Sequence, residues 1–276
     1  MTDTVNPFAQ PTQPAPASAG SGGGFNVPVE TVTLPSQGLV YPLGHPLSNE
    51  KQVDIKCMTA KEEDLLTSRA LIKNGTVISQ LLRSCILNKS VDPDDMLVGD
   101  RNAVLIAIRI TGYGAEYKAK IECPQCGEDY ENEFSLSQLR VKPLTAQSAA
   151  PNENLFDFTL PGTGQRVQIR LLTGRDEAEI SKISERKKKL QSQIDNNVTA
   201  RLFSSIVSLN GETDKNKISQ AVNNMRASDS RALRRFIDDI EPGVQMKQTV
   251  SCPHCVEESE VNVPLGISFF WPDLGN

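Results

Sequence analysis

The chain has 276 residues, of which 38% are hydrophobic, and its formal net charge is −5 at pH 7. This is enough for one large or two small domains with a hydrophobic core, whereas the acidic balance argues against a general affinity for nucleic acid or anionic lipid, which both need basic surface. We expect no contact with a membrane, because no apolar run approaches the roughly 20 residues of a spanning helix.

The six cysteines point to metal binding more than to disulfides. The first residues lack the basic and apolar segments of a signal peptide, so we expect a protein of the reducing cytoplasm. In that compartment cysteines serve as metal ligands or as buried thiols.

Residues 1–27 are rich in Pro, Ala, Ser, Gln and Gly and contain few large apolar side chains. Such a segment cannot bury enough apolar surface to fold alone, so we expect a disordered arm. A solvated tail is the reading we favour over a docking peptide that becomes ordered on a partner.

Ordered structure is expected from Val29, with alternating residues that predict one strand there and another over residues 53–57. Thr59 and Glu62 then have the spacing of a capping box, in which each side chain bonds to the other residue's backbone amide. This predicts a helix whose apolar face consists of Leu65, Leu66 and Ala70.

Two more helices are predicted before the first cysteine pair. The helix over residues 77–87 has one apolar stripe, and the next begins at Asp100 as its cap and continues to Gly112. Between them Asp92-Pro-Asp-Asp reads as a plain turn, because it lacks the glycine and glutamate of a calcium-binding loop. The stripe consists of Ile78, Leu81, Leu82 and Cys85.

Cys123-Pro-Gln-Cys126 lies between two segments of alternating apolar residues. We therefore predict a strand, a cysteine turn and a second strand. The two thiolates of a Cys-x-x-Cys turn can point at one metal ion.

The same order of signals returns after residues 144–154, which lack apolar periodicity and which we expect to be a linker. Thr173 and Asp176 repeat the spacing of a helix start, and a helix is predicted over residues 198–209. A gapless shift of 129 residues aligns residues 100–136 with 229–265 and gives eleven identities in thirty-seven positions. We infer an internal duplication, with repeats over residues 28–143 and 155–276.

The duplication explains how two distant cysteine pairs form one site. Each pair offers two ligands, whereas structural zinc needs four in a tetrahedral shell. We predict that the two hairpins meet in a zinc-ribbon-like site that holds one structural ion per chain. Its ligands are Cys123, Cys126, Cys252 and Cys255.

The remaining candidates have simpler explanations. Cys57 and Cys85 align with Leu171 and Ile206 of the second repeat, which indicates small core side chains. His254, between two ligands, is expected to point away from the ion, and His45 is an isolated loop residue. For the closing Phe269-Phe-Trp-Pro we favour core packing over an anchor for a neighbouring subunit.

Enzymatic functions have little support. A redox Cys-x-x-Cys normally begins a helix, whereas both pairs here lie between strands. Two histidines at unrelated places do not assemble a catalytic set, and the glycine loops typical of nucleotide binding are absent from the sequence. We expect no catalytic residues and no small-molecule substrate.

Nucleic acid is the alternative partner to consider, because zinc ribbons often bind it. The hairpin arms read Glu128-Asp-Tyr-Glu-Asn-Glu and Glu257-Glu-Ser-Glu, and such acidic tips repel phosphate. A zinc-ribbon nucleic-acid-binding regulator is therefore the second hypothesis, and a thiol oxidoreductase the third.

Several stretches resemble the baseplate hub assembly proteins of T-even-type, contractile-tailed bacteriophages. They are Leu34-Pro-Ser-Gln-Gly-Leu-Val-Tyr41, Met58-Thr-Ala-Lys-Glu-Glu-Asp-Leu-Leu66, Leu81-Leu-Arg-Ser-Cys-Ile86 and Cys123-Pro-Gln-Cys126. The resemblance covers most of residues 28–270 as an order of elements. Members of that family need not carry both cysteine pairs, so it does not by itself account for the zinc site.

The resemblance implies a non-enzymatic virion or assembly protein that helps to build the hub of a phage tail through contacts with other tail or hub proteins. It would act in the host cytoplasm during assembly or stay in the tail baseplate of the virion. The expected fold is α+β, made of two related halves that each contain strands, helices and a hairpin.

Overall fold

The computed structural model describes residues 27–189, 197–265 and 267–270. The predicted arm, residues 1–27, lies outside this part of the chain except for its last residue. The helices are α1 (Ala60–Thr67), α2 (Arg69–Lys73), α3 (Val77–Cys85), α4 (Val98–Tyr113), α5 (Gly174–Lys189), α6 (Asn197–Ser205), α7 (Lys215–Asn223) and α8 (Ala227–Ile240), with 3₁₀ turns η1 (Leu136–Gln138) and η2 (Ile267–Phe270). Every described helix is too short or too polar to cross a lipid bilayer.

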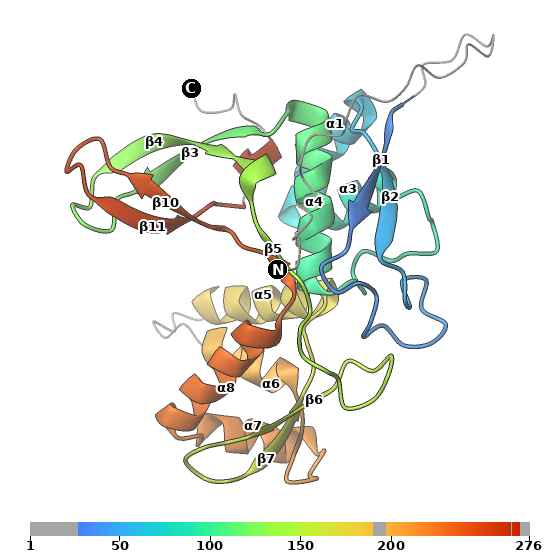
Figure 1. The fold of residues 1–276 in the computed structure, drawn as a ribbon, viewed down its shortest axis with the longest axis vertical. Helices are drawn as coiled ribbons and strands as arrows, with labels where there is room; N and C mark the ends of the chain where they lie inside the picture. Colours follow the sequence, from blue (N-terminus) through green and yellow to red (C-terminus); the bar gives the residue numbers. More distant parts are fainter. Residues whose placement is uncertain (1–26, 190–196, 266, 271–276) are drawn as a thin grey trace, which may run out of the picture.

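The strands form five small antiparallel sheets, so the chain mixes helices with strands as predicted. They pair as β1 (Val29–Thr33) with β2 (Gln52–Lys56), β3 (Glu116–Glu122) with β4 (Asp129–Ser135), β5 (Val141–Lys142) with β9 (Gly243–Val244), β10 (Lys247–Ser251) with β11 (Glu258–Asn262), and β6 (Phe156–Thr159) with β7 (Arg166–Ile169) and β8 (Ile206–Leu209). Figure 1 shows α4 at the centre, with β1 and β2 on one side, two long hairpins on the other and α5 to α8 below.

The predicted capping box at the start of α1 is confirmed. The carboxylate of Glu62 accepts hydrogen bonds from the N–H of Thr59 at 3.0 Å and from its hydroxyl at 2.5 Å. Leu66 is buried, but the prediction that Ala70 belongs to the same apolar face was wrong, because α1 ends at Thr67 and Ala70 is exposed in α2. Ser68, with extended backbone, separates the two short helices.

The prediction that Asp100 caps α4 was also wrong. Leu97 occupies the cap position, and Asp100 lies in the first turn with its side chain completely buried. Its carboxylate accepts hydrogen bonds from the N–H and hydroxyl of Ser36, at 2.8 and 2.5 Å, and from the hydroxyl of Tyr41 at 2.8 Å. Asp100 thus fixes the loop after β1 to α4.

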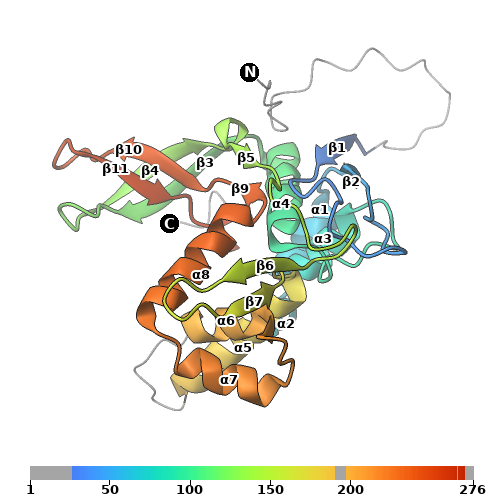
Figure 2. The same cartoon turned by 60° about the horizontal axis from the view of Figure 1, so that its bottom comes forward.

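In the second half, the helix predicted over residues 198–209 is shorter than expected. It ends at Ser205, and Ile206–Leu209 continue as β8, which pairs with β7 through Ile169 and Ile206. Both partners are β-branched residues, which pack well in a strand. The stacked rings of Phe158 and Phe236, 4.6 Å apart, join β6 to α8, and the two elements lie side by side in Figures 1 and 2.

Corresponding positions of the two halves make the same kinds of contact. Lys56 bonds to Glu62 at 2.6 Å beside α1, and Arg170 bonds to Asp176 at 2.6 Å beside α5. Asp229, in the position of Asp100, accepts a hydrogen bond from the N–H of Gly162 at 2.6 Å. Its second oxygen is buried and has no hydrogen-bond partner among the described residues, since a glycine stands where the first half has Ser36.

The two halves are joined by backbone contacts and charges on one side of α4. The N–H of Val98 donates to Leu172 O at 3.0 Å. Arg175 pairs with Asp95 at 2.6 Å, in the predicted Asp92-Pro-Asp-Asp turn. On the other side Gly99 lies against Pro242, where a Cβ on the glycine would come within 1.8 Å of the carbonyl oxygen.

The C-terminal aromatic residues are part of the core, as we favoured. Phe269 and Phe270 are completely buried, and the ring of Phe269 meets that of Tyr117 edge-on at 5.0 Å. Arg109, buried in α4, donates to Phe269 O at 2.7 Å. The Trp and Pro that follow Phe270 in the sequence lie outside the described residues.

Replacing Glu62 with Gln should destabilise the protein by roughly 2–3 kcal/mol, because the carboxylate accepts bonds from Lys56 and Ser84 as well as from Thr59. Although burial raises the pKa of Glu62, these hydrogen bonds lower it to about 2 from its usual 4.5. Its contribution should therefore be present above pH 4.5 and be lost as the pH falls towards 2. Chemical denaturation of wild type and variant from pH 7 to pH 3 checks this, with Asp64→Asn as an exposed control. A stability difference independent of pH would contradict the assignment.

Candidate metal centre

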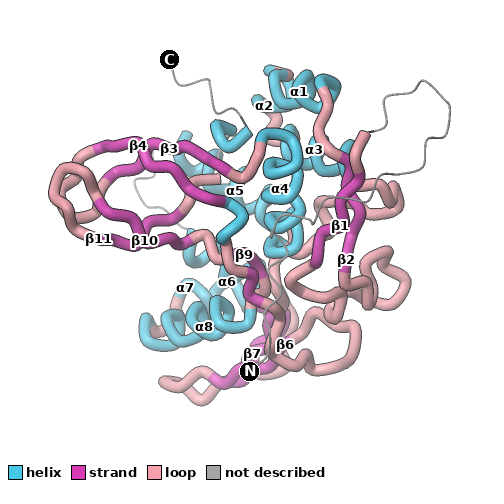
Figure 3. Tube along the Cα trace, turned by 45° about the horizontal axis from the view of Figure 1, so that its top comes forward, coloured by secondary structure: helices cyan, strands magenta, loops and turns pink. Residues whose placement is uncertain are grey.

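Two β-hairpins carry the four candidate cysteines. The buried residues of β3 alternate with exposed ones, as do Val250 in β10 and Val261 in β11, so each hairpin has one apolar face and one solvent face. The buried set in β3 is Tyr117, Ala119 and Ile121. Figure 3 shows the two hairpins one above the other, projecting together from the helices.

The two cysteine turns have the same backbone geometry. The N–H of Cys123 donates to Glu128 O at 2.9 Å, and the N–H of Gly127 donates to Cys123 O at 2.8 Å. In the other hairpin the N–H of Cys252 donates to Glu257 O at 3.1 Å, and the N–H of Val256 donates to Cys252 O at 2.9 Å. Each turn thus presents two sulfurs at the tip of its hairpin.

The hairpin tips bring the four sulfurs together. Their Sγ atoms all lie within 4.8 Å of one another, and the distances across the hairpins are 3.8 Å for Cys123 to Cys255 and 3.8 Å for Cys126 to Cys252. A regular tetrahedron with metal–sulfur bonds of about 2.3 Å has edges of about 3.8 Å. The cysteines therefore lie close enough to bind one metal ion.

The electrostatics of the site favour a bound cation. Backbone N–H groups of Cys126 and Gln125 lower the pKa of Cys123 to about 6. A hydrogen bond from the Glu128 N–H lowers the pKa of Cys126, but burial and the neighbouring sulfurs outweigh it and raise this pKa to about 12. The pKa of Cys255 is also raised. A hydrogen bond from the Glu257 N–H lowers this pKa, but burial and the sulfurs of Cys252 and Cys123 raise it by more. Without a cation the cluster resists full deprotonation, whereas a divalent ion would compensate several thiolates at once.

The other cysteines and both histidines lie outside the cluster. Cys85 is buried in the core as predicted, whereas Cys57 is only half-buried. His254 is exposed at the hairpin tip, and His45 stacks on Tyr41 at 4.6 Å.

Sequence reasoning missed Tyr130, whose hydroxyl is buried beside the sulfurs and has no hydrogen-bond partner among the described residues. Burial raises its pKa, and the neighbouring cysteine sulfurs, Cys252 foremost, raise it further. The shift of 129 residues aligns Tyr130 with Ser259, whose hydroxyl is also buried and has no partner in the part of the chain that the structure describes. The alternation of apolar residues in β4 predicts only on which face of the hairpin the Tyr130 side chain lies.

Val256→Gly should stabilise the protein by about 1 kcal/mol. Val256 has a φ of 62° in an exposed turn, where Gly127 of the first hairpin has 75°, and a β-branched residue is strained in this left-handed region. The reciprocal change Gly127→Val should destabilise by a similar amount or more. Thermal unfolding of both variants with zinc present checks this, and equal midpoints for the two would show that the turn does not need this conformation.

No curated protein and no solved structure matches the chain. The model of one protein family, described as T4 bacteriophage base plate protein, matches residues 40–271, which include all four cysteines. The chain therefore belongs to the T4 bacteriophage base plate protein family.

Proposed function

We propose that this chain is a non-enzymatic structural or assembly protein of the hub of a phage tail baseplate. The family match over residues 40–271 carries this proposal, because it spans both halves and both hairpins. The hub role itself rests on the resemblance of residues 34–126 to hub assembly proteins. The protein acts through contacts with other tail proteins, either in the host cytoplasm during assembly or in the tail baseplate of the finished particle.

We propose zinc as the ion held by Cys123, Cys126, Cys252 and Cys255. Four thiolates in a tetrahedral arrangement are typical of structural zinc, and a full set of protein ligands leaves no open position for catalysis. The ion links two hairpins that are far apart in the sequence in the manner of a zinc ribbon. Its role is to stabilise the scaffold.

We also propose that residues 28–143 and 155–276 arose by duplication, with residues 144–154 as the linker. Support comes from the eleven aligned identities, from the matched pairs beside α1 and α5, and from the two cysteine turns with the same hydrogen bonds. Each half alone supplies two of the four sulfurs.

Isolating particles of the phage that encodes this chain tests the proposed function. Mass spectrometry of purified tails should find the chain, or the chain should co-purify with baseplate intermediates from infected cells. Its absence from both, combined with salt-sensitive binding to DNA or RNA, would instead support a nucleic-acid-binding regulator.

A further inference from the structure

A strained valine is exposed at the tip of the second cysteine hairpin. Val256 is 77% exposed and has a φ of 62°, in the left-handed region that a β-branched residue disfavours. Gly127 occupies the corresponding position of the first hairpin, so the turn itself needs no side chain here. Backbone strain of this kind is concentrated at sites where proteins bind or switch. The side chain of Val256 therefore points to a contact outside its own turn.

The surface around Val256 is acidic. Glu257 and Glu258 follow it directly and are both exposed, as is Glu128 at the corresponding position of the neighbouring hairpin. The two hairpins, residues 116–135 and 247–262, carry nine carboxylates and three lysines, hence a net charge of −6, whereas the whole chain carries −5. We call Val256, Glu257 and Glu258 the hairpin tip. It presents one apolar side chain within an acidic surface.

A cavity between α6 and α8 suits such an apolar side chain. Its volume is about 260 Å³, and Val198, which lines it, is 42% exposed although it belongs to an otherwise apolar wall. Concave sites of this kind, with an apolar wall and a few charged groups, are where proteins bind other molecules. The apolar lining consists of Leu172, Val198, Leu202 and Ile237, and the charged lining of Arg201, Arg234, Asp238 and Glu241.

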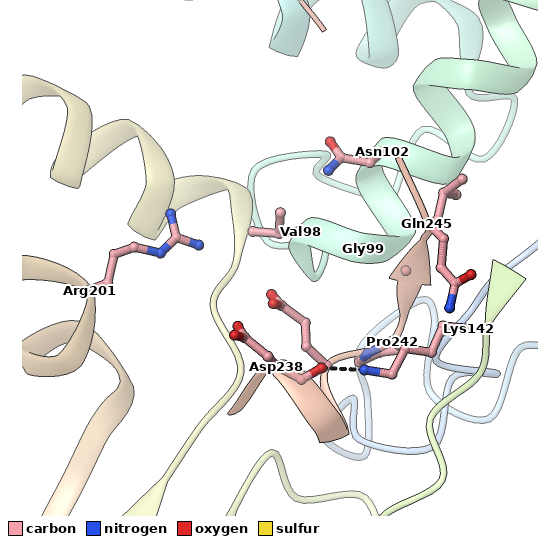
Figure 4. Close-up of a pocket in the computed structure, with 11 residues that line it drawn as sticks. Val98, Gly99, Asn102, Lys142, Arg201, Asp238, Pro242 and Gln245 are labelled. Atoms are coloured by element: carbon pink, nitrogen blue, oxygen red, sulfur yellow. Dashed lines mark hydrogen bonds between the residues drawn. The ribbon is translucent and has the colours of Figure 1, made fainter. Parts of the chain in front are cut away.

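The charge around this cavity is opposite to that of the hairpins. Two further cavities, of about 250 and 1120 Å³, adjoin it and share Asp238 and Glu241 with it. Figure 4 shows Arg201 and Lys142 on opposite sides of the cavity of 250 Å³. Together the three cavities are lined by three carboxylates and by five cations, which are Arg140, Lys142, Arg201, Arg234 and Lys247. Such complementary charge favours association with an acidic surface.

The hairpin tip lies away from the cavities of its own chain. β10 begins at the largest cavity with Lys247 and runs outward for five residues, or about 17 Å, before the cysteine turn that holds Val256. Figure 3 shows both hairpins projecting from the helices. The tip of one copy is therefore available to the cavity of another.

We propose that Val256 of one copy inserts into the cavity between α6 and α8 of a second copy, with Glu257 and Glu258 against the arginines of that cavity. The tip and the cavity are different surfaces, so the contact is head-to-tail and leaves one tip and one cavity open for further copies. Repeating the contact builds a ring or a row of chains. This self-association goes beyond the proposed baseplate function and is a property of the purified chain.

Val256→Gly separates this contact from a structural role, because the two predict opposite effects. In dilute, monomeric protein the glycine relieves the strained φ and should raise the unfolding midpoint. It also removes the apolar side chain, so the dissociation constant for self-association should rise at least about tenfold. Sedimentation of the full-length, zinc-loaded chain measures this constant. The control Leu43→Ala, which changes an exposed apolar residue in another loop, should leave it unchanged.

Val198→Asp tests the cavity. An aspartate in the first turn of α6 favours the helix, so the variant should fold normally, but it places a negative charge where the acidic tip binds. We expect at least about a tenfold weaker self-association. The matched control is Asn216→Asp, an exposed position in the first turn of α7, which should have no effect.

A mixture of the two variants tests the head-to-tail arrangement. The intact tip of Val198→Asp fits the intact cavity of Val256→Gly, so the mixture should form a dimer that neither variant forms alone. Failure of this mixture to associate would contradict the arrangement. Zinc-loaded wild type that stays monomeric at low salt would overturn the inference, as would self-association that Val256→Gly and Val198→Asp both leave unchanged.

Discussion

Cys126→Ser and Cys255→Ser should each destabilise the whole protein by several kcal/mol and abolish tight zinc binding. Structural zinc binds zinc-finger peptides with about 10–16 kcal/mol, and this binding energy is folding energy when the site forms only in the folded chain. The two residues belong to different hairpins, 3.8 Å from Cys252 and Cys123 respectively. Removing either ligand should therefore release both hairpins. Thermal unfolding followed by circular dichroism, with and without chelator, measures the loss.

The matched control is Cys57→Ser, which changes a half-buried cysteine outside the cluster. We expect it to cost about 1 kcal/mol or less and to leave the effect of chelator unchanged. If Cys126→Ser lost only the binding of a partner and unfolded like wild type, the structural role of the site would be wrong.

Gly99→Ala should have the second largest effect, a loss of about 3 kcal/mol or more. A Cβ at this position would lie 1.8 Å from Pro242 O and 2.8 Å from the Cα of Gly243, and both contacts are with backbone. Side-chain rotation cannot relieve them, so α4 must move away from β9. The gain in helix propensity of about 1 kcal/mol does not compensate.

Gly112→Ala in the same helix provides the control. There the added Cβ would meet the side chain of Met58 at 3.3 Å, which a small shift relieves. We expect a change within about 1 kcal/mol in either direction, with Gly99→Ala, Gly112→Ala and wild type all measured by urea denaturation. Equal effects of the two substitutions would show that the contact between Gly99 and Pro242 does not limit packing.

Local sequence signals predicted much of the architecture. Thr59 and Glu62 marked the start of α1, alternation marked β3, and the spacing of the cysteine pairs indicated that their sulfurs meet. These features depend on residues close in sequence, or on a repeat that makes two distant segments alike. They are the features that sequence alone can specify.

The errors arose where tertiary contacts outweigh local preference. Residues 206–209 continue an apolar helical pattern, but the free edge of β7 recruits them as a strand. Asp100 has the residue type of a helix cap, yet Ser36 and Tyr41 bind it inside the core. The cavity of about 250 Å³ beside Glu241 could not be foreseen, because its lining comes from α4, α6, α8 and β9, which are far apart in the sequence.

The metal content of the protein tests the central claim, that one zinc ion joins the two hairpins, most directly. Elemental analysis of full-length protein prepared without chelator, together with native mass spectrometry, should give about one zinc per chain. Protein without metal in which Cys123 and Cys126 form a disulfide would contradict the claim and restore the redox hypothesis.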